Sequence, residues 1–168
     1  MTRIVHRCPF FSEETIVRSP TGDVQVVAYQ IIVWVSLQIR GVFSQPFPAI
    51  LDTGHSHNLS IGEKHLLDWT GNRPGDLRTI GEINLNNRLT ALKRAEVALC
   101  ANVPGERRLL AREPYLLATL GGITVLASAD PLTPRLPLLG MRAIVRSKLR
   151  TTIDGRRGWV TIGKGLFS

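Results

Sequence analysis

The stretch Ala49-Ile50-Leu51-Asp52-Thr53-Gly54 is the most informative part of the 168-residue sequence. Three apolar residues suited to a buried strand are followed at once by an acid, a hydroxyl residue and a glycine. The pattern predicts a strand that delivers the carboxyl group of Asp52 at its end. An Asp-Thr-Gly triplet alone is weak evidence, because it also fits an ordinary aspartate in the turn after a strand.

The segments around this stretch predict a mostly β fold with one or two short helices. Val, Ile and Thr are plentiful, and turn residues recur at short intervals, as in folds built from many short strands. The apolar spacing of residues 62–69 predicts a short helix. The candidate strands of the first half are residues 15–18, 24–29, 31–40, 48–52 and 59–61.

The second half predicts three hairpins and a helix. The expected hairpin arms are residues 77–83 with 89–99 around Asn86-Asn87, 115–119 with 123–128 around Gly121-Gly122, and 151–153 with 159–162. Residues 140–149 predict a basic amphipathic helix that buries Met141, Ile144, Val145 and Leu149. Residues 1–20 are expected to form an N-terminal arm, and residues 21–168 the main domain.

The net charge and the spacing of the basic residues narrow the class of binding partner. Lys and Arg number 21 against 13 acids, which gives a net charge of +8 and would favour acidic partners such as nucleic acid. The basic residues come mostly in ones and twos, and no nucleic-acid motif accompanies them, so we expect no nucleic-acid partner.

The apolar segments and the cysteines predict whether the protein contacts a membrane and in which compartment it lies. No apolar segment reaches the roughly 20 residues that span a bilayer, so we expect no membrane partner. The start of the sequence lacks the apolar stretch of a secretory signal. Cys8 and Cys100 are too few for a disulfide framework. A cytoplasmic protein with two reduced thiols is therefore expected.

Taken in order, these segments resemble the retropepsin-like aspartic proteases, the family of the retroviral proteases and their cellular relatives. The resemblance runs from about Val33 to Gly163. It rests on the Asp-Thr-Gly strand end, the short helix at 62–69, the hairpin at 77–91 and Leu138-Leu139-Gly140 before a helix. It implies a half-barrel fold that is closed by homodimerisation.

The resemblance implies an aspartic endopeptidase whose catalytic residues are Asp52, Thr53 and Gly54. Two carboxylates sharing one proton would activate water and protonate the peptide carbonyl. This sequence has one such triplet, whereas a single-chain protease would have two, so Asp52 of each subunit would meet on a two-fold axis. Thr53 would hydrogen-bond across that axis, and Gly54 would let the substrate approach. No cofactor or metal is implied.

The substrate implied by the resemblance is an extended peptide, bound by strand addition beneath a flap. The hairpin around residues 83–87 would be the flap. Leu138 or Leu139 would line a side-chain pocket below the substrate. The predicted substrate-binding residues are His55, Ser56, Ile83, Leu85, Asn86, Leu138, Leu139 and Gly140.

Several positions depart from the family pattern. His55 stands where many members have a small residue, and we expect it to alter the pH dependence of cleavage. Ser56 and Met141 stand where retroviral members often pair an Asp with an Arg. A dimer of the same fold with weak or no activity, binding a peptide or an acidic partner, is therefore the alternative.

Three histidines could suggest a metal site. His55 and His57 alternate as ligands on one face of a strand would, and His65 follows. No Cys or carboxylate follows at a convincing spacing, so ordinary surface or loop histidines are expected instead.

Overall fold

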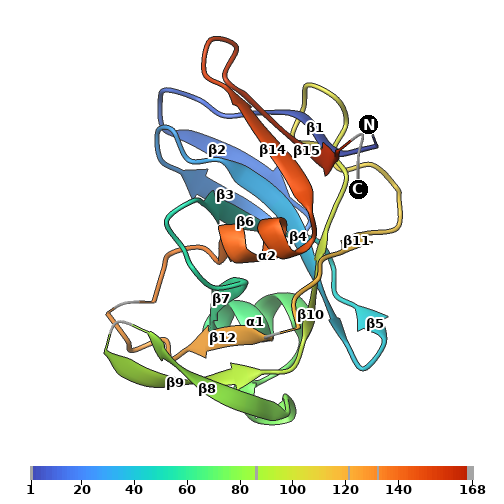
Figure 1. Cartoon of the computed structure of the whole chain (residues 1–168). Helices are drawn as coiled ribbons and strands as arrows, with labels where there is room; N and C mark the ends of the chain where they lie inside the picture. Colours follow the sequence, from blue (N-terminus) through green and yellow to red (C-terminus); the bar gives the residue numbers. More distant parts are fainter. Residues whose placement is uncertain (1, 86, 121, 132, 166–168) are drawn as a thin grey trace.

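The computed structural model describes residues 2–85, 87–120, 122–131 and 133–165 as a mostly β fold with two short α-helices (Figure 1). This confirms the expected fold class at that level. The helices are α1 (Glu63–Thr70) and α2 (Met141–Arg146). The strands are β1 (Arg3–Pro9), β2 (Thr15–Ser19), β3 (Gly22–Val26), β4 (Ile32–Ile39), β5 (Val42–Phe43), β6 (Phe47–Asp52), β7 (Leu59–Gly62), β8 (Thr79–Leu85), β9 (Arg88–Lys93), β10 (Glu96–Leu99), β11 (Tyr115–Leu116), β12 (Ile123–Leu126), β13 (Leu138–Gly140), β14 (Leu149–Asp154) and β15 (Trp159–Lys164).

Three sheets organise the described part of the chain. The largest has the strand order β11-β10-β4-β6-β13-β7-β12-β9-β8, with β5 paired to β4. A second sheet has the order β1-β15-β14, and β2 and β3 form a hairpin of their own. In Figure 1 the β14–β15 hairpin lies at the top and the β8–β9 hairpin at the bottom, with α2 between them.

The short strand β13 holds the centre of the large sheet together. It pairs in parallel with the end of β6, so that Gly140 lies beside Asp52. On its other side it pairs antiparallel with β7, so that Leu139 lies beside Leu59. Segments that are far apart in the sequence therefore meet where the Asp-Thr-Gly stretch ends.

Strand β4 separates two hydrophobic clusters. It lies between β10 and β6, and its first six residues are all buried. Successive side chains of a strand point to opposite faces. Accordingly, Val33 and Val35 belong to the main core, whereas Ile32 and Trp34 belong to a second cluster completed by the β2–β3 hairpin.

The expected N-terminal arm contains β1 and β2. β1 pairs antiparallel with β15, and its residues Ile4, Val5 and Cys8 are buried in the main core. The boundary predicted at residue 20 falls in the turn between β2 and β3. The two chain ends therefore lie side by side (Figure 1).

Two hairpin predictions were wrong in their partners. Residues 115–119 and 123–128 do not pair with each other, because β11 pairs with β10 and β12 pairs with β7 and β9. The predicted arm at 89–99 is two strands, since β9 pairs with β8 whereas β10 pairs with β4. The pairing of β8 with β9 confirms the rest of that first hairpin, and the β14–β15 hairpin confirms the third prediction.

The predicted helix at 62–69 is confirmed by α1, and the helix at 140–149 is shorter than expected. α2 ends at Arg146, after which the Ser147 hydroxyl donates to Ala143 O (2.6 Å). Lys148 then has a positive φ of 51°, which turns the chain into β14. Val145 was expected to be buried but is 65% exposed. In the described residues, neither helix has the length and apolar character needed to cross a membrane.

Both cysteines are free and buried. Burial raises the pKa of the Cys8 thiol to about 11 and that of the Cys100 thiol to about 12. Both thiols are therefore protonated at neutral pH and are poor nucleophiles.

The buried face of β1 predicts that the N-terminal segment stabilises the whole domain. Val5→Ala should lower the free energy of unfolding by about 1–3 kcal/mol, because Val5 is 1% exposed in the main core. Ile16→Ala, at a residue 68% exposed on β2, is the matched control and should change it by less than about 0.5 kcal/mol. Urea denaturation measures both. Equal effects would show that β1 is not part of the cooperative unit.

Candidate active site

The carboxyl group of Asp52 lies at the open end of a buried strand. Phe47, Ala49 and Leu51 of β6 are buried, whereas Asp52 is half-buried and Thr53 and Gly54 are exposed. The apolar strand thus anchors the backbone in the core and leaves the carboxyl group at the surface. This is the placement that the sequence predicts for Asp52.

One backbone amide orients the Asp52 carboxyl group, and a second closes the turn that follows it. The Gly54 N–H donates to Asp52 Oδ1 (2.8 Å), and the His55 N–H donates to Asp52 O (3.3 Å). This is a tight turn in which an aspartate bonds to its own backbone two residues on. The turn fixes one carboxylate oxygen, while the exposed Thr53 hydroxyl has no hydrogen-bond partner within the described part of the chain.

Gly140 lets the loop after Asp52 lie directly on β13. A Cβ at residue 140 would lie 1.9 Å from His57 O and 2.5 Å from His55 O, closer than atoms can approach. The Gly140 N–H also donates to Asn58 O (3.0 Å). Only glycine fits beneath these carbonyl groups, so the predicted site residue Gly140 supports the loop rather than offering a side chain.

His55 is anchored by a short chain of buried hydroxyl groups. Its Nε2 lies 2.8 Å from Ser60 Oγ, and Ser60 Oγ lies 2.5 Å from Thr124 Oγ1. The Thr124 hydroxyl also lies within hydrogen-bond distance of Leu59 O (3.3 Å). Ser60 and Thr124 are almost completely buried, so this chain holds the His55 ring in one orientation beside Asp52.

Burial lowers the pKa of both histidines in this loop. For His55 the neighbouring His57 lowers the pKa further and the Asp52 carboxylate opposes this. For His57 burial acts together with the positive charge of Arg142. The two rings meet edge to face with centroids 5.4 Å apart. Both rings are therefore neutral at pH 7.

The β8–β9 hairpin brings Leu85 and Ile83 to this loop. A cavity of about 170 Å³ is shared by Leu85 and the loop residues Gly54, His55, Ser56 and His57. Its remaining walls are Ser60, Leu126, Pro134 and Leu138. Ile83 lines an adjoining cavity of about 80 Å³ together with His57 and Arg142.

The remaining predicted site residues, Leu138, Leu139 and Asn86, do not all line the cavity. Leu138 is half-buried in the cavity wall, whereas Leu139 is completely buried in the core and supports the wall from behind. Asn86 lies outside the described residues.

His65 lies apart from the other two histidines, because its ring stacks on Trp69 in α1 (4.3 Å). No group of three metal-ligating side chains gathers among the described residues.

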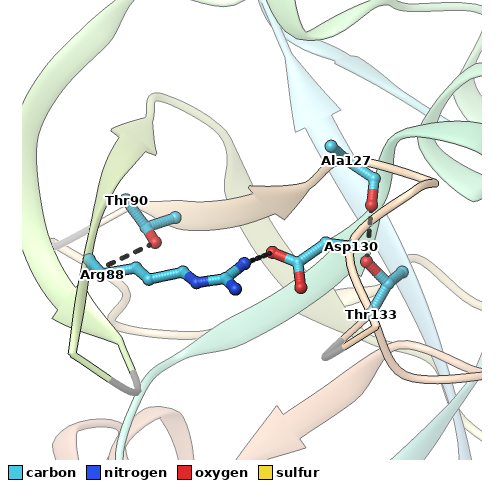
Figure 2. Close-up of polar contacts among 5 residues, drawn as sticks. All are labelled: Arg88, Thr90, Ala127, Asp130 and Thr133. Atoms are coloured by element: carbon cyan, nitrogen blue, oxygen red, sulfur yellow. Dashed lines mark hydrogen bonds and ion pairs between the residues drawn. The ribbon is translucent and has the colours of Figure 1, made fainter.

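An ion pair joins the start of β9 to the loop at residues 127–135. The Arg88 guanidinium lies 3.2 Å from the Asp130 carboxylate (Figure 2). Within the loop the Thr133 hydroxyl donates to Ala127 O (2.6 Å), which closes the turn that carries Asp130 (Figure 2). Because Pro134 of this loop lines the cavity, the ion pair connects the hairpin to a loop that forms part of the cavity wall.

Sequence reasoning missed four residues of the site: Ser60, Thr124, Leu126 and Pro134. A signal existed for Ser60 and Thr124, since each is a hydroxyl residue between apolar residues of a buried strand. Nothing in the sequence pairs them, because they are 64 positions apart.

Comparison with known proteins gives one distant likeness. No protein-family model and no curated protein matches the sequence. Among solved structures, the chain is similar to a retropepsin-like aspartic protease from Rickettsia conorii, with 15% sequence identity and a TM-score of 0.36. The similarity covers 88% of this chain and 97% of that one. Identity and TM-score this low assign no role to any residue of this chain.

The contact at Gly140 predicts that this position tolerates no side chain. Gly140→Ala should lower the free energy of unfolding by about 1–3 kcal/mol or more, because the Cβ would collide with two backbone carbonyl groups. Gly75→Ala is the matched control, since a Cβ there meets nothing within 4 Å. Urea denaturation compares the two. A Gly140→Ala protein as stable as the control would contradict the close contact.

The Arg88–Asp130 ion pair predicts control of hairpin mobility with little effect on overall stability. Arg88→Ala should speed amide hydrogen exchange across β8 and β9, while unfolding changes by less than about 1 kcal/mol, because the Arg88 side chain is 59% exposed. Exchange followed by mass spectrometry measures this. Arg157→Ala, which removes the ion pair with Asp154 in the β14–β15 hairpin, is the control and should leave β8 and β9 unchanged.

Proposed function

We propose that this protein is an aspartic endopeptidase of the retropepsin-like type, a half-barrel closed by homodimerisation. The observation that carries the proposal is the Asp52 carboxyl group. It is fixed by the Gly54 N–H at the end of a buried strand, and the next residues, Gly54 and His55, line a cavity that Leu85 of the β8–β9 hairpin also lines. This placement suits a carboxyl group that acts on a bound chain rather than one that only ends a strand.

The proposal requires a second copy of the chain. No carboxylate is among the described residues that line the cavity, and Asp52 lies next to its wall residue Gly54. The chemistry needs two carboxylates, and one chain supplies only Asp52 there. Asp52 and Thr53 are accessible at the surface, so a two-fold axis beside them would bring two Asp52 side chains together. The exposed Thr53 hydroxyl would then bond to the partner and Gly54 would face the substrate.

The reaction follows from the paired carboxylates. Two carboxylates about 3 Å apart cannot both ionise readily, so the pair holds one proton and titrates as a unit. The ionised member takes a proton from water, and the protonated member donates to the peptide carbonyl oxygen. The water oxygen attacks the carbonyl carbon and gives a tetrahedral diol. Collapse of the diol breaks the C–N bond while the carboxyl pair gives a proton to the leaving amine nitrogen and takes one from a diol hydroxyl, so the pair again holds one proton. No metal or cofactor takes part.

The substrate in this proposal is an extended peptide bound by strand addition. Among the described strands β8 ends the large sheet, so its outer edge offers unpaired main-chain groups to a peptide. The hairpin would act as the flap, with Ile83 and Leu85 facing the substrate. Leu138, His55 and Ser56 would contact it from the cavity wall.

A peptide-binding module without hydrolysis is the second candidate. It is favoured by His55, whose half-buried ring occupies the cavity wall directly after the Asp-Thr-Gly turn. A dimer that binds peptides and cleaves none across pH 4 to 8 would support this candidate and overturn the first.

Removal of the Asp52 carboxylate should abolish cleavage. We expect Asp52→Asn to lower the rate on a peptide library by at least about 10²–10⁴-fold, because the variant can neither take up nor donate the proton. Asp23→Asn, at an exposed position on β3, is the control and should cleave normally. Mass spectrometry of the products between pH 4 and 8 measures both. Cleavage that persists in the Asp52 variant would exclude the mechanism.

Mixing subunits tests whether two copies share the site. A tenfold excess of Asp52→Asn protein should lower wild-type cleavage by roughly tenfold through inactive mixed dimers, whereas an excess of Asp23→Asn protein should not. A strictly monomeric mass in solution during cleavage would overturn the shared site.

A further inference from the structure

The His55 ring presents one nitrogen to its surroundings and hides the other. Nε2 contacts Ser60, and a Cβ at Gly140 would lie 3.1 Å from Cδ2, so that edge of the ring faces the interior. Nδ1 lies on the opposite edge. It has no hydrogen-bond partner among the described residues, and it is not one of the buried unpartnered atoms. Nδ1 is therefore accessible.

The hydroxyl chain determines which nitrogen carries the proton. Each hydroxyl group has one hydrogen to donate. If the Thr124 hydroxyl donates to Leu59 O, then Ser60 donates to Thr124, and His55 Nε2–H donates to Ser60. This order satisfies every contact of the chain. It leaves Nδ1 of the neutral ring as a hydrogen-bond acceptor.

The cavity beside this ring is lined by both apolar and polar residues. Its apolar walls are Leu85, Leu126, Pro134 and Leu138, and its polar walls are Ser56, Ser60 and the two histidines. His55 and His57 are the titratable residues that line it. The charged groups that act on them are the Asp52 carboxylate at the end of β6 and Arg142 on α2.

We propose that His55 is a pH-switched specificity determinant of this cavity, accepting a hydrogen bond from a substrate hydroxyl or amide when neutral and donating one to a substrate carboxylate when protonated. This rests on the proposed function, because the cavity is taken as a subsite for a peptide side chain. Glutamine can serve either state, since its amide both donates and accepts, whereas glutamate only accepts. The preference for Glu over Gln at this position should therefore rise as the pH falls.

The surroundings of His55 determine in which direction a change of pH acts on the ring and over which pH range. Burial lowers the pKa of His55 below the ordinary value of 6.5, so the ring is neutral at pH 7.5 and gains its proton only below pH 6.5. A substrate glutamate stays ionised down to about pH 4.5. Any pH at which both partners are charged therefore lies between these two limits.

A first experiment reads the ring directly and needs no activity. Long-range ¹⁵N–¹H NMR correlations report which imidazole nitrogen is protonated, and His55→Ala assigns the signal. The expected result is the Nε2–H form at pH 8 and protonation below pH 6.5. In Ser60→Ala the preference for the Nε2–H form should be lost. An Nδ1–H form in the wild-type protein would overturn the proposal.

A second experiment measures specificity by binding. Peptides with a reduced, uncleavable bond carry Gln or Glu at each position in turn, and fluorescence anisotropy gives Kd at pH 5.0 and 7.5. At one peptide position, the Kd of the Gln peptide divided by the Kd of the Glu peptide should be about tenfold higher at pH 5.0 than at pH 7.5. The cause is the charge-assisted hydrogen bond from protonated His55 to the glutamate. His65→Ala, on α1 away from the loop, should retain this change. His55→Ala should lose it.

The outcomes separate this proposal from the proposed function. A pH shift of equal size in His55→Ala, or no peptide binding at either pH, overturns the specificity switch. A His55-dependent shift in a protein that cleaves no peptide supports the switch and overturns the endopeptidase. Cleavage by the wild-type protein with a pH-independent Gln to Glu ratio overturns the switch alone.

Discussion

The backbone of Gly140 lies directly beneath the carbonyl groups of His55 and His57, and the geometry of the site depends on this contact. Because no side chain separates the two segments, the loop after Asp52 rests on β13 at backbone distance. β13 is in turn fixed on both sides, by β6 and by β7. The position of the Asp52 carboxyl group is therefore set by main-chain pairing in a buried sheet, and the surface loop adds only the local turn.

Buried hydroxyl groups support the His55 ring in the loop after Asp52. A half-buried imidazole next to a carboxyl group needs a partner for its inner nitrogen, because a buried donor without an acceptor is costly. Ser60 supplies that partner, and Thr124 and Leu59 O complete the chain. The buried hydroxyl residues thus hold an imidazole ring in place directly after the Asp-Thr-Gly turn. The same contacts leave the outer nitrogen for a ligand.

Local patterns in the sequence predicted individual strands and helices. They could not predict which strands pair, because pairing depends on contacts between segments that are far apart in the sequence. β6, β7 and α1 were predictable, because apolar runs and flanking turn residues define them within a few positions. The same local reasoning joined the strands around Gly121-Gly122 into a hairpin, although β12 pairs with β7 in parallel. Choice of partner depends on the whole sheet, which no single turn encodes.

For the site, Asp52 and Gly140 were both predicted as site residues through the resemblance, and the structure pairs them across β6 and β13. The chain from His55 through Ser60 to Thr124 was not predictable, because it joins strands that only the folded sheet brings together. The proximity of Leu85 to the loop was expected only from the resemblance, which gave the hairpin as a flap, and in the structure both line one cavity.

The far wall of the cavity depends on a loop that no motif marks. Residues 127–135 carry Pro134 into the cavity wall and are held by three separate elements of the fold. The contacts are Ser128 N–H to Glu63 Oε1 on α1, Asp130 to Arg88 on β9, and Arg135 to Gln25 O on β3. The last contact links the cavity wall to the N-terminal hairpin. Because β3 is itself packed on the second hydrophobic cluster through Val26, the N-terminal segment supports the cavity as well as the core.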